Sequence, residues 1–212
     1  MIAAGLLALA TPAWAAPTTV DPWHSAGNGS PTGTNFGTVP SLDILYSGKD
    51  NPGNSPDTAQ MVVYALWGTL THVSYTDRNW ADIGLRPDAG WLGGVSLFSF
   101  ALGSYLGNTV HSDVRVYNYD YSQLLYQQSV NFGSTAILFT PNLFSANGMH
   151  IQFSNEDRLN FPIAIDDITV EAGNTVPQSS VPEPATMGIL GLGVLAAGAM
   201  RRRRAVSRGA TR

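Results

Sequence analysis

The sequence of 212 residues contains no cysteine and only one lysine, Lys49. The absence of cysteine excludes disulfide bonds, thiol catalysis and cysteine-ligated zinc, so the fold must be stabilised by its core. Helical periodicity and internal repeats are also absent, which argues against helical bundles, propellers and solenoids.

Motifs for catalysis are missing as well. There is no Gly-x-Ser-x-Gly nucleophile elbow and no phosphate-binding glycine loop. The four histidines, including His150, are isolated from one another, and the alternation around His150 predicts that it faces solvent. A pair of carboxylates ~5–9.5 Å apart would serve a polysaccharide hydrolase, but sequence spacing does not show such a distance. We therefore expect a protein that is not an enzyme.

The C-terminus has three distinct parts. An apolar run covers residues 185–200. It is preceded by Val181, Pro182, Glu183 and Pro184 and followed by Arg201, Arg202, Arg203 and Arg204. The run is slightly shorter than the ~17–25 residues of a membrane helix. Arginines resist translocation, so they would hold the C-terminus in the cytoplasm.

This tail resembles the PEP-CTERM sorting signal of Gram-negative bacteria that make extracellular polysaccharide, a tail also called the ice-binding protein C-terminal domain. The resemblance implies recognition by an exosortase, a membrane transpeptidase that cuts near the motif. The alternative is a permanent membrane anchor, but this gives no reason for Pro182-Glu183-Pro184. Four glycines inside the short span would also make an anchor marginal.

The N-terminus predicts a signal peptide over residues 1–15. An apolar core is followed by Ala13-Trp14-Ala15, the small-x-small pattern that signal peptidase cleaves. No basic residue precedes the core, so we expect the true start codon to lie upstream. A buried N-terminal helix is the alternative, and Pro12 and Pro17 argue against it.

Between the two signals the chain is acidic. Residues 16–180 contain five basic and 14 acidic side chains, a net charge of −9. This balance disfavours nucleic-acid binding and suits solubility outside the cell or divalent cations. We expect a signal peptide over 1–15, a flexible arm over 16–40, a β-sandwich over 41–171, a linker over 172–181, the sorting signal over 182–204 and a cytoplasmic tail over 205–212.

The middle of the chain predicts an all-β fold of two packed antiparallel sheets. Short apolar runs are separated by turn residues at intervals of ~8–12 residues. The clearest strand covers residues 149–154, where apolar and polar side chains alternate. The expected strands are residues 42–46, 60–67, 70–75, 94–101, 113–119, 123–130, 135–139, 149–154 and 161–170.

Several segments resemble the jelly-roll domains found upstream of PEP-CTERM tails, which are similar to galactose-binding and carbohydrate-binding modules. Residues 94–103 resemble a strand that runs into an SFxLG turn. Residues 114–117 and 124–126 resemble paired strands, and residues 161–170 match a closing AIDDI strand. The resemblance implies an antiparallel jelly-roll β-sandwich.

Asp166 and Asp167 lie in that closing strand. Both faces of the strand are apolar, so at least one carboxylate should point inwards and needs a partner. In similar sandwiches an acid near this position helps to hold a structural Ca²⁺, which makes Asp166 and Asp167 candidate calcium ligands. The alternative is a carboxylate that accepts backbone N–H bonds or pairs with an arginine.

Tyr117, Tyr119 and Tyr121 alternate along one expected strand edge. Aromatic rings in a row can form a stacking platform for sugar rings, and Trp80 and Trp91 lie in turn-rich segments that could serve the same purpose. Cross-strand packing is the alternative. We expect an exported surface or matrix protein with a structural or adhesive role. The second hypothesis is a lectin-like module for extracellular polysaccharide.

Overall fold

The computed structural model describes residues 17–20, 28–32, 39–67, 69–89, 93–155 and 162–173. All of them belong to the first of the two units into which the chain divides, residues 1–177. The predicted signal peptide with Ala13 and Ala15, the predicted helix over 185–200 and Trp91 lie outside this set. Within the described set, no helix has the length and apolar character needed to span a membrane.

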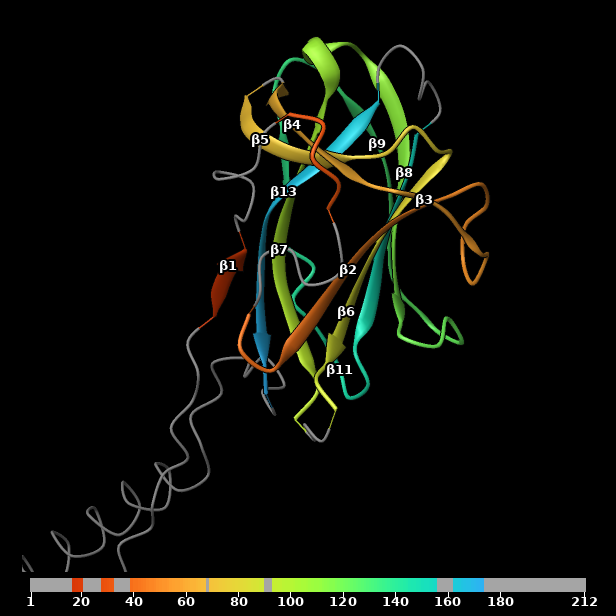
Figure 1. The fold of residues 1–212 in the computed structure, drawn as a ribbon, viewed down its shortest axis with the longest axis vertical. Coiled ribbons are helices and arrows are strands. Elements are labelled where there is room, and N and C mark those ends of the chain that lie inside the picture. The colour runs from red at the N-terminus through yellow and green to blue at the C-terminus, as the bar shows by residue number, and fades with distance from the viewer. Residues whose placement is uncertain are drawn as a thin grey trace, which may run out of the picture. The chain divides into compact units, whose positions relative to one another are not determined.

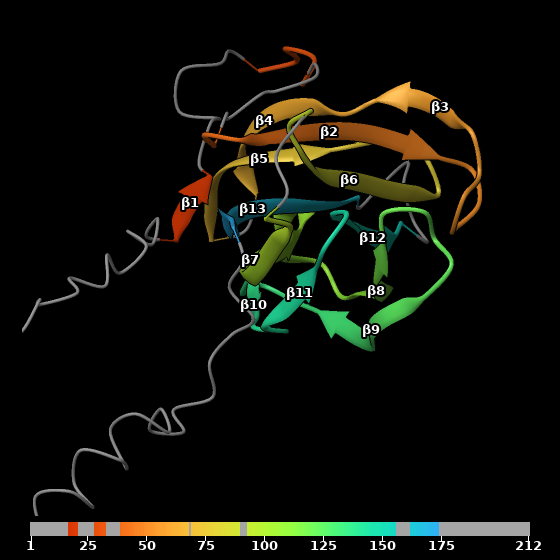
Figure 2. The same ribbon diagram turned by 90° about the horizontal axis from the view of Figure 1, so that it is seen from below.

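Two antiparallel sheets face each other and form an all-β sandwich (Figures 1 and 2). The six-stranded sheet has the order β3 (Asp57–Gln60), β2 (Leu42–Lys49), β6 (Trp80–Pro87), β12 (Met149–Ser154), β8 (Val110–Asn118) and β9 (Leu124–Phe132). The prediction of a β-sandwich is confirmed. The finer assignment to the jelly-roll class stays a prediction.

The seven-stranded sheet is built around two long strands, β7 (Val95–Ser104) and β13 (Ile163–Ala172). Its other strands are β10 (Ile137–Phe139) and β11 (Leu143–Ser145), which pair with β7, and β5 (Leu70–Tyr75), β4 (Val62–Trp67) and β1 (Thr18–Val20). The 3₁₀ turn η2 (Tyr105–Gly107) follows β7.

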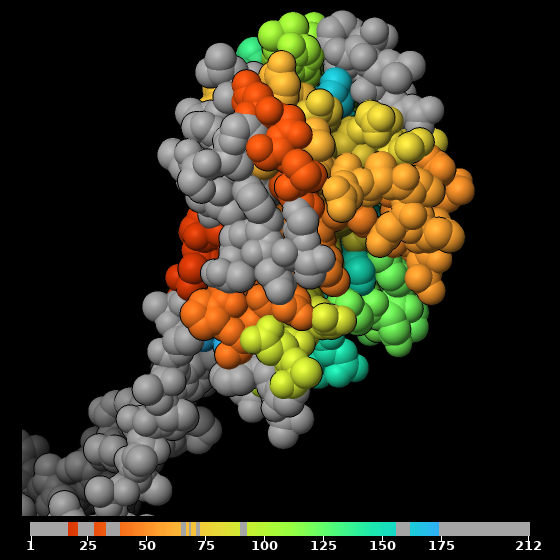
Figure 3. Space-filling view, in the orientation of Figure 1, coloured from red at the N-terminus to blue at the C-terminus, as the bar shows by residue number. Residues whose placement is uncertain are grey.

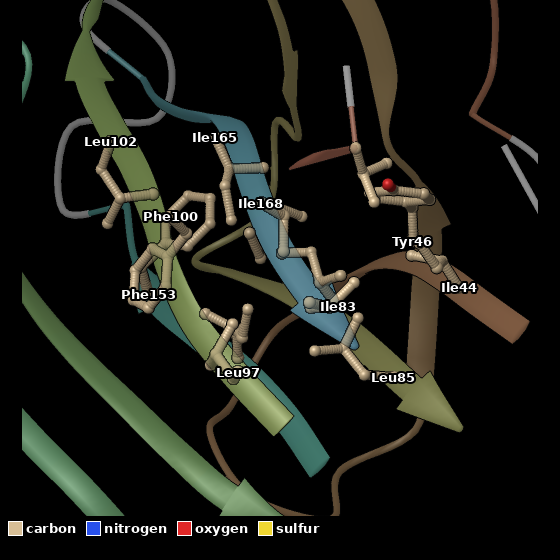
Figure 4. Packing of buried hydrophobic residues seen from close by; sticks show 14 of the residues in the cluster. Ile44, Tyr46, Ile83, Leu85, Leu97, Phe100, Leu102, Phe153, Ile165 and Ile168 are labelled. Carbon is tan, nitrogen blue, oxygen red and sulfur yellow. The ribbon is translucent and has the colours of Figure 1, made fainter. Parts of the chain in front are cut away.

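The core lies between the sheets because alternate side chains of both sheets point inwards. Figure 4 shows Ile44 of β2, Ile83 and Leu85 of β6, and Phe100 of β7 within this cluster. Ile83 and Leu85 lie opposite Tyr46 and Ile44 in the register of β2 and β6. The same alternation sends the polar side chains of the six-stranded sheet to its outer face.

The strand predictions for residues 70–75 and 149–154 match the observed bounds. Strands β1, β3, β6 and β11 were not predicted, and β6 is a central strand of its sheet. Its sequence WADIGLRP contains Asp82 and Gly84, residue types that are depleted in strands. The apolar residues Ala81, Ile83 and Leu85 nevertheless alternate, so a two-residue period was present.

Described parts of the range 16–40, which was expected to be a flexible arm, pair with strands of the sandwich. Strand β1 pairs with β13, and Val20 is buried in the core. Pro31 bridges to Val62, while the hydroxyl of Thr32 donates to the carbonyl of Met61. Residues rich in Pro, Gly, Ser and Thr can pair through their backbones, and composition alone does not reveal this.

Candidate functional site

The outer face of the six-stranded sheet brings polar residues from three strands into register. Asp82 of β6 lies between Ser47 of β2 and Gln152 of β12. One step along the sheet, Gly84 lies opposite Leu45 on one side and opposite His150 on the other. Since side chains two residues apart share a face, these positions form one surface.

Asp82 is the centre of a buried hydrogen-bond network. Its Oδ2 atom lies 2.7 Å from Nζ of Lys49 and also accepts hydrogen bonds of 2.7 Å from the hydroxyl of Tyr121 and from Nε2 of Gln152. Its Oδ1 atom lies 2.7 Å from Nδ1 of His150. The side chains of Asp82 and Lys49 are only 2% and 4% exposed, so a charged pair is held almost completely away from water.

The geometry assigns the protons of the network. A carboxylate can only accept, so Nδ1 of His150 carries a proton towards Asp82. The Tyr121 hydroxyl donates to Asp82 and accepts from Nζ of Lys49 at 2.8 Å. No hydrogen bond to Nε2 of His150 occurs among the described residues.

A pocket of about 470 Å³ lies directly over this network. One wall is the β2–β3 connection, residues 50–56, and another is the β8–β9 turn, residues 119–123. The orange and green segments that carry these walls meet at the right of Figure 3. The lining residues are Leu45, Ser47, Lys49, Asn54, Ser55, Pro56, Asp57, Asp82, Gly84, Tyr119, Asp120, Tyr121 and His150.

Gln152 fixes the first wall to the sheet. The backbone N–H of Gly53 donates to Oε1 of Gln152 at 2.8 Å, and Nε2 of Gln152 donates to the Gly53 carbonyl at 3.0 Å. Gly53 has a φ of +74°, a backbone conformation that glycine adopts without steric cost. The connection therefore closes over Lys49, whose Nζ also reaches the Gly53 carbonyl.

The second wall holds Tyr121 in an unusual conformation. Its φ of +60° is uncommon for a residue other than glycine. The turn is supported by hydrogen bonds from the Tyr121 N–H to the Asn118 carbonyl and from the Ser122 N–H to Oδ1 of Asp120. Strained residues of this kind cluster at functional sites, where the surrounding structure holds them.

Aromatic rings surround His150. The rings of Tyr121 and His150 are stacked with centroids 4.2 Å apart, and Tyr119 lies 4.9 Å from His150. Tyr117 contacts Tyr121 at 5.8 Å. Gly84 leaves room for this arrangement, because a Cβ atom there would lie 3.1 Å from Cε1 of His150.

The charges of the network stabilise one another. Burial alone would raise the pKa of Asp82, but the hydrogen bond and charge of His150, together with Lys49, hold it below its usual range. Burial, together with the adjacent Asp82 carboxylate, raises the pKa of Tyr121, so its hydroxyl remains a donor. The Asp82 carboxylate therefore already accepts a hydrogen bond from each of its neighbouring donors, and the site is preorganised.

The structure brings together the three tyrosines singled out in the sequence, but not as predicted. Strand β8 ends at Asn118, so Tyr119 and Tyr121 lie in the following turn rather than along a strand edge. Their role in glycan binding stays a prediction. Trp80 begins β6, where the guanidinium of Arg115 lies 5.0 Å from the centroid of its ring, and it does not line the pocket.

His150 was expected to face solvent, and this was wrong. It lies on the outer face as the alternation indicated, but the pocket walls leave it only 12% exposed. Lys49, Asp82 and Gln152 were not recognised as site residues. Their local signal was a polar residue at alternate positions of a strand, which is common on any solvent-facing sheet.

Asp166 and Asp167 occupy a β-bulge, which ends the expected alternation of faces. Asp167 has a φ of +50° and is exposed, while Asp166 is buried. The bulge places Ile165 and Ile168 both in the core. Oδ1 of Asp166 accepts the Asp167 N–H at 2.8 Å, which favours the hydrogen-bonding alternative. No group of three metal-ligating side chains occurs in the described part of the chain.

Comparison with known proteins identifies the C-terminus. Residues 180–204 match the PEP-CTERM protein-sorting motif. The motif indicates an exported protein that passes through the membrane and is sorted by an exosortase. The matched segment includes Val181 to Pro184 and Arg201 to Arg204, all of which lie outside the described residues. No curated protein sequence matches the chain.

Among solved structures, family 29 carbohydrate-binding modules are similar at a low level. Two point mutants of CBM29-2, studied for ligand recognition, are 13% and 14% identical to this chain, with TM-scores of 0.35 and 0.37. In both cases 79% of this chain and 99% of the module are covered. A further family 29 module is 14% identical to this chain and has a TM-score of 0.31. That match covers 60% of this chain and 88% of the module. Scores this low carry no argument about the ligand of this protein.

Proposed function

We propose that this protein is an exported, exosortase-sorted component of the cell surface or extracellular matrix whose outer pocket binds carbohydrate. Its role there is adhesive, and it performs no catalysis. Signal peptidase would release its N-terminus, and the ligand would be part of an extracellular polysaccharide. The alternative is a purely structural role without a specific ligand.

The pocket over Asp82 is the main support for carbohydrate binding. Its volume of about 470 Å³ falls within the ~300–1,000 Å³ that small-molecule sites occupy. Tyr119 supplies an aromatic ring, on which the apolar face of a sugar ring can stack. Polar atoms fixed by the Asp82 network supply directional hydrogen bonds. Aromatic faces beside a few fixed polar groups suit a sugar better than a purely apolar molecule.

The pocket lacks an arrangement for nucleophilic catalysis within the described residues. His150 is oriented by Asp82, as the base of a hydrolase would be. However, the hydroxyl of Ser47 donates to Asp57, and that of Ser55 donates to the Asn51 carbonyl. Neither serine of the lining donates to His150, which supports a binding role.

The test is a glycan array probed with the full chain in mild detergent. We expect retention of a defined set of glycans, with binding lost in Tyr119→Ala because a ring face is removed from the pocket. Tyr105→Ala is the matched control, since this half-buried tyrosine packs on Trp67 of the other sheet. Absence of binding to every glycan, or equal loss in both variants, would leave the structural alternative.

A further inference from the structure

The hydrogen-bond donors beneath the pocket are already used within the protein. The Asp82 carboxylate accepts hydrogen bonds from Lys49, Tyr121, Gln152 and His150. The ammonium group of Lys49 also donates to the Tyr121 hydroxyl and lies 3.6 Å from Oδ1 of Asp57. A ligand would have to break this buried network to take a hydrogen bond from it, and this would leave charge uncompensated.

The groups that remain for a ligand are mainly acceptors. Asp57 lines the pocket and its side chain is 65% exposed. Asp120 lines it as well and is exposed, and hydrogen bonds from the hydroxyl and N–H of Ser122 lower its pKa, so it is ionised at neutral pH. Nε2 of His150 has no hydrogen bond among the described residues, so it is open to a ligand.

The lining carries an excess of negative charge. It contains three carboxylates, those of Asp57, Asp82 and Asp120, against Lys49 and the charge of His150 that faces Asp82. Lys49 is 4% exposed and closest to Asp82, so its charge is neutralised locally. The net charge of −9 over residues 16–180 adds a negative field around the pocket. A uronic acid or a sulfated sugar would be repelled by this site.

The aromatic walls also suit a cation. Nζ of Lys49 lies 4.6 Å from the centroid of the Tyr121 ring, which is a cation–π distance. The ring therefore already takes part in one such contact. Tyr119, beside the exposed Asp120, is a second aromatic ring in the pocket lining.

We propose that the ligand of this pocket is an amino sugar whose protonated amino group lies between Asp57 and Asp120. This inference rests on the proposed carbohydrate binding and names its substrate class. The protonated amine brings positive charge and hydrogen-bond donors to these two carboxylates. The sugar ring stacks on Tyr119.

Calorimetric titration of the full chain with three matched tetrasaccharides tests this. The probes are tetramers of glucosamine, N-acetylglucosamine and galacturonic acid. The titration is done at about pH 6, below the pKa of ~7.7–8.0 of an ordinary α-amino group, so that the amine is protonated. We expect the glucosamine tetramer to bind most tightly. Its affinity should fall as salt rises from about 0.05 to about 0.5 M, because exposed charges are screened.

Variants separate this inference from the proposed function. Asp57→Asn and Asp120→Asn should each weaken glucosamine binding about two- to fivefold, as expected for exposed ion pairs. Asp88→Asn removes the same charge from an exposed carboxylate outside the lining and should change nothing. Tighter binding of the N-acetylated or uronate tetramer, or equal effects of all three substitutions, would overturn the amino-sugar inference alone. No binding to any tetramer or to any arrayed glycan would overturn the proposed function too.

Discussion

The Nζ atom of Lys49 lies 2.7 Å from Oδ2 of Asp82, and neither side chain has more than 4% of its surface exposed. Lys49 is the only lysine of the chain. A buried ion pair seldom adds stability over a well-packed apolar pair, because both charges lose their hydration. Its presence beneath a pocket therefore indicates a functional reason, which we assign to the shape and polarity of the site.

Removing one partner should destabilise the fold strongly. We expect Asp82→Asn and Lys49→Met each to lower the free energy of unfolding by about 3–5 kcal/mol, since each leaves a buried group uncompensated. Chemical denaturation measures this change. The partly exposed pair of Arg86 and Asp43 is the control, and Asp43→Asn should cost less than about 1 kcal/mol. Equal losses in both pairs would contradict the buried network.

The stability should also depend on pH through Asp82. Its pKa is lowered in the folded state, so the folded protein holds its proton less tightly than the unfolded chain. The stabilisation is therefore complete above the unfolded pKa of ~3.9 and is lost as the pH falls through the folded value. Thermal unfolding between about pH 7 and pH 2 should show this loss, and Asp82→Asn should flatten the profile. Parallel profiles for the two proteins would show that another carboxylate is responsible.

Gly84 should be required for the position of His150. In Gly84→Ala the new Cβ would lie 3.1 Å from Cε1 of His150, so the ring must shift and its 2.7 Å contact with Asp82 lengthens. We expect the Nδ1–H resonance of His150 to lose its exchange protection in NMR spectra. Gly133→Ala is the control, because a Cβ there meets nothing within 4 Å. A protected resonance in Gly84→Ala would contradict the predicted displacement.

The sorting motif gives a prediction in the producing cells. Glu183→Ala should leave an unprocessed chain in the inner membrane, because the recognition motif is lost while the apolar run and Arg201 to Arg204 still retain it. The wild-type product should end before Arg201. Mass spectrometry of the extracellular fraction checks both expectations. An exported protein that still contains Arg212 would show that the tail is not removed.

Alternation of apolar and polar residues predicted much of the sandwich. Residues 70–75 and 149–154 could be assigned because local pattern and burial agree there. Strand β6 was not predicted, because Asp82 and Gly84 resemble turn residues when read locally. The reason for both residues lies in other strands: Asp82 binds Lys49, and Gly84 accommodates His150.

The candidate site was harder to predict because its members are distant in sequence. Lys49 and Tyr121 are 72 positions apart, and Gln152 and Asp82 are 70 apart. Only the pairing of β2, β6, β12 and β8 brings them together. The tyrosines could be recognised because they alternate locally. The positive φ of Tyr121 could not be predicted, because the residue at that position is not a glycine.

We propose that the pocket over Asp82 is the ligand-binding site. An NMR titration of the protein with a glycan retained on the array tests this proposal. We predict chemical-shift changes concentrated at Tyr119, Tyr121, His150 and residues 50–57. Changes centred instead on Tyr64, Trp67 and Tyr105 of the opposite sheet, with the pocket signals unmoved, would contradict it.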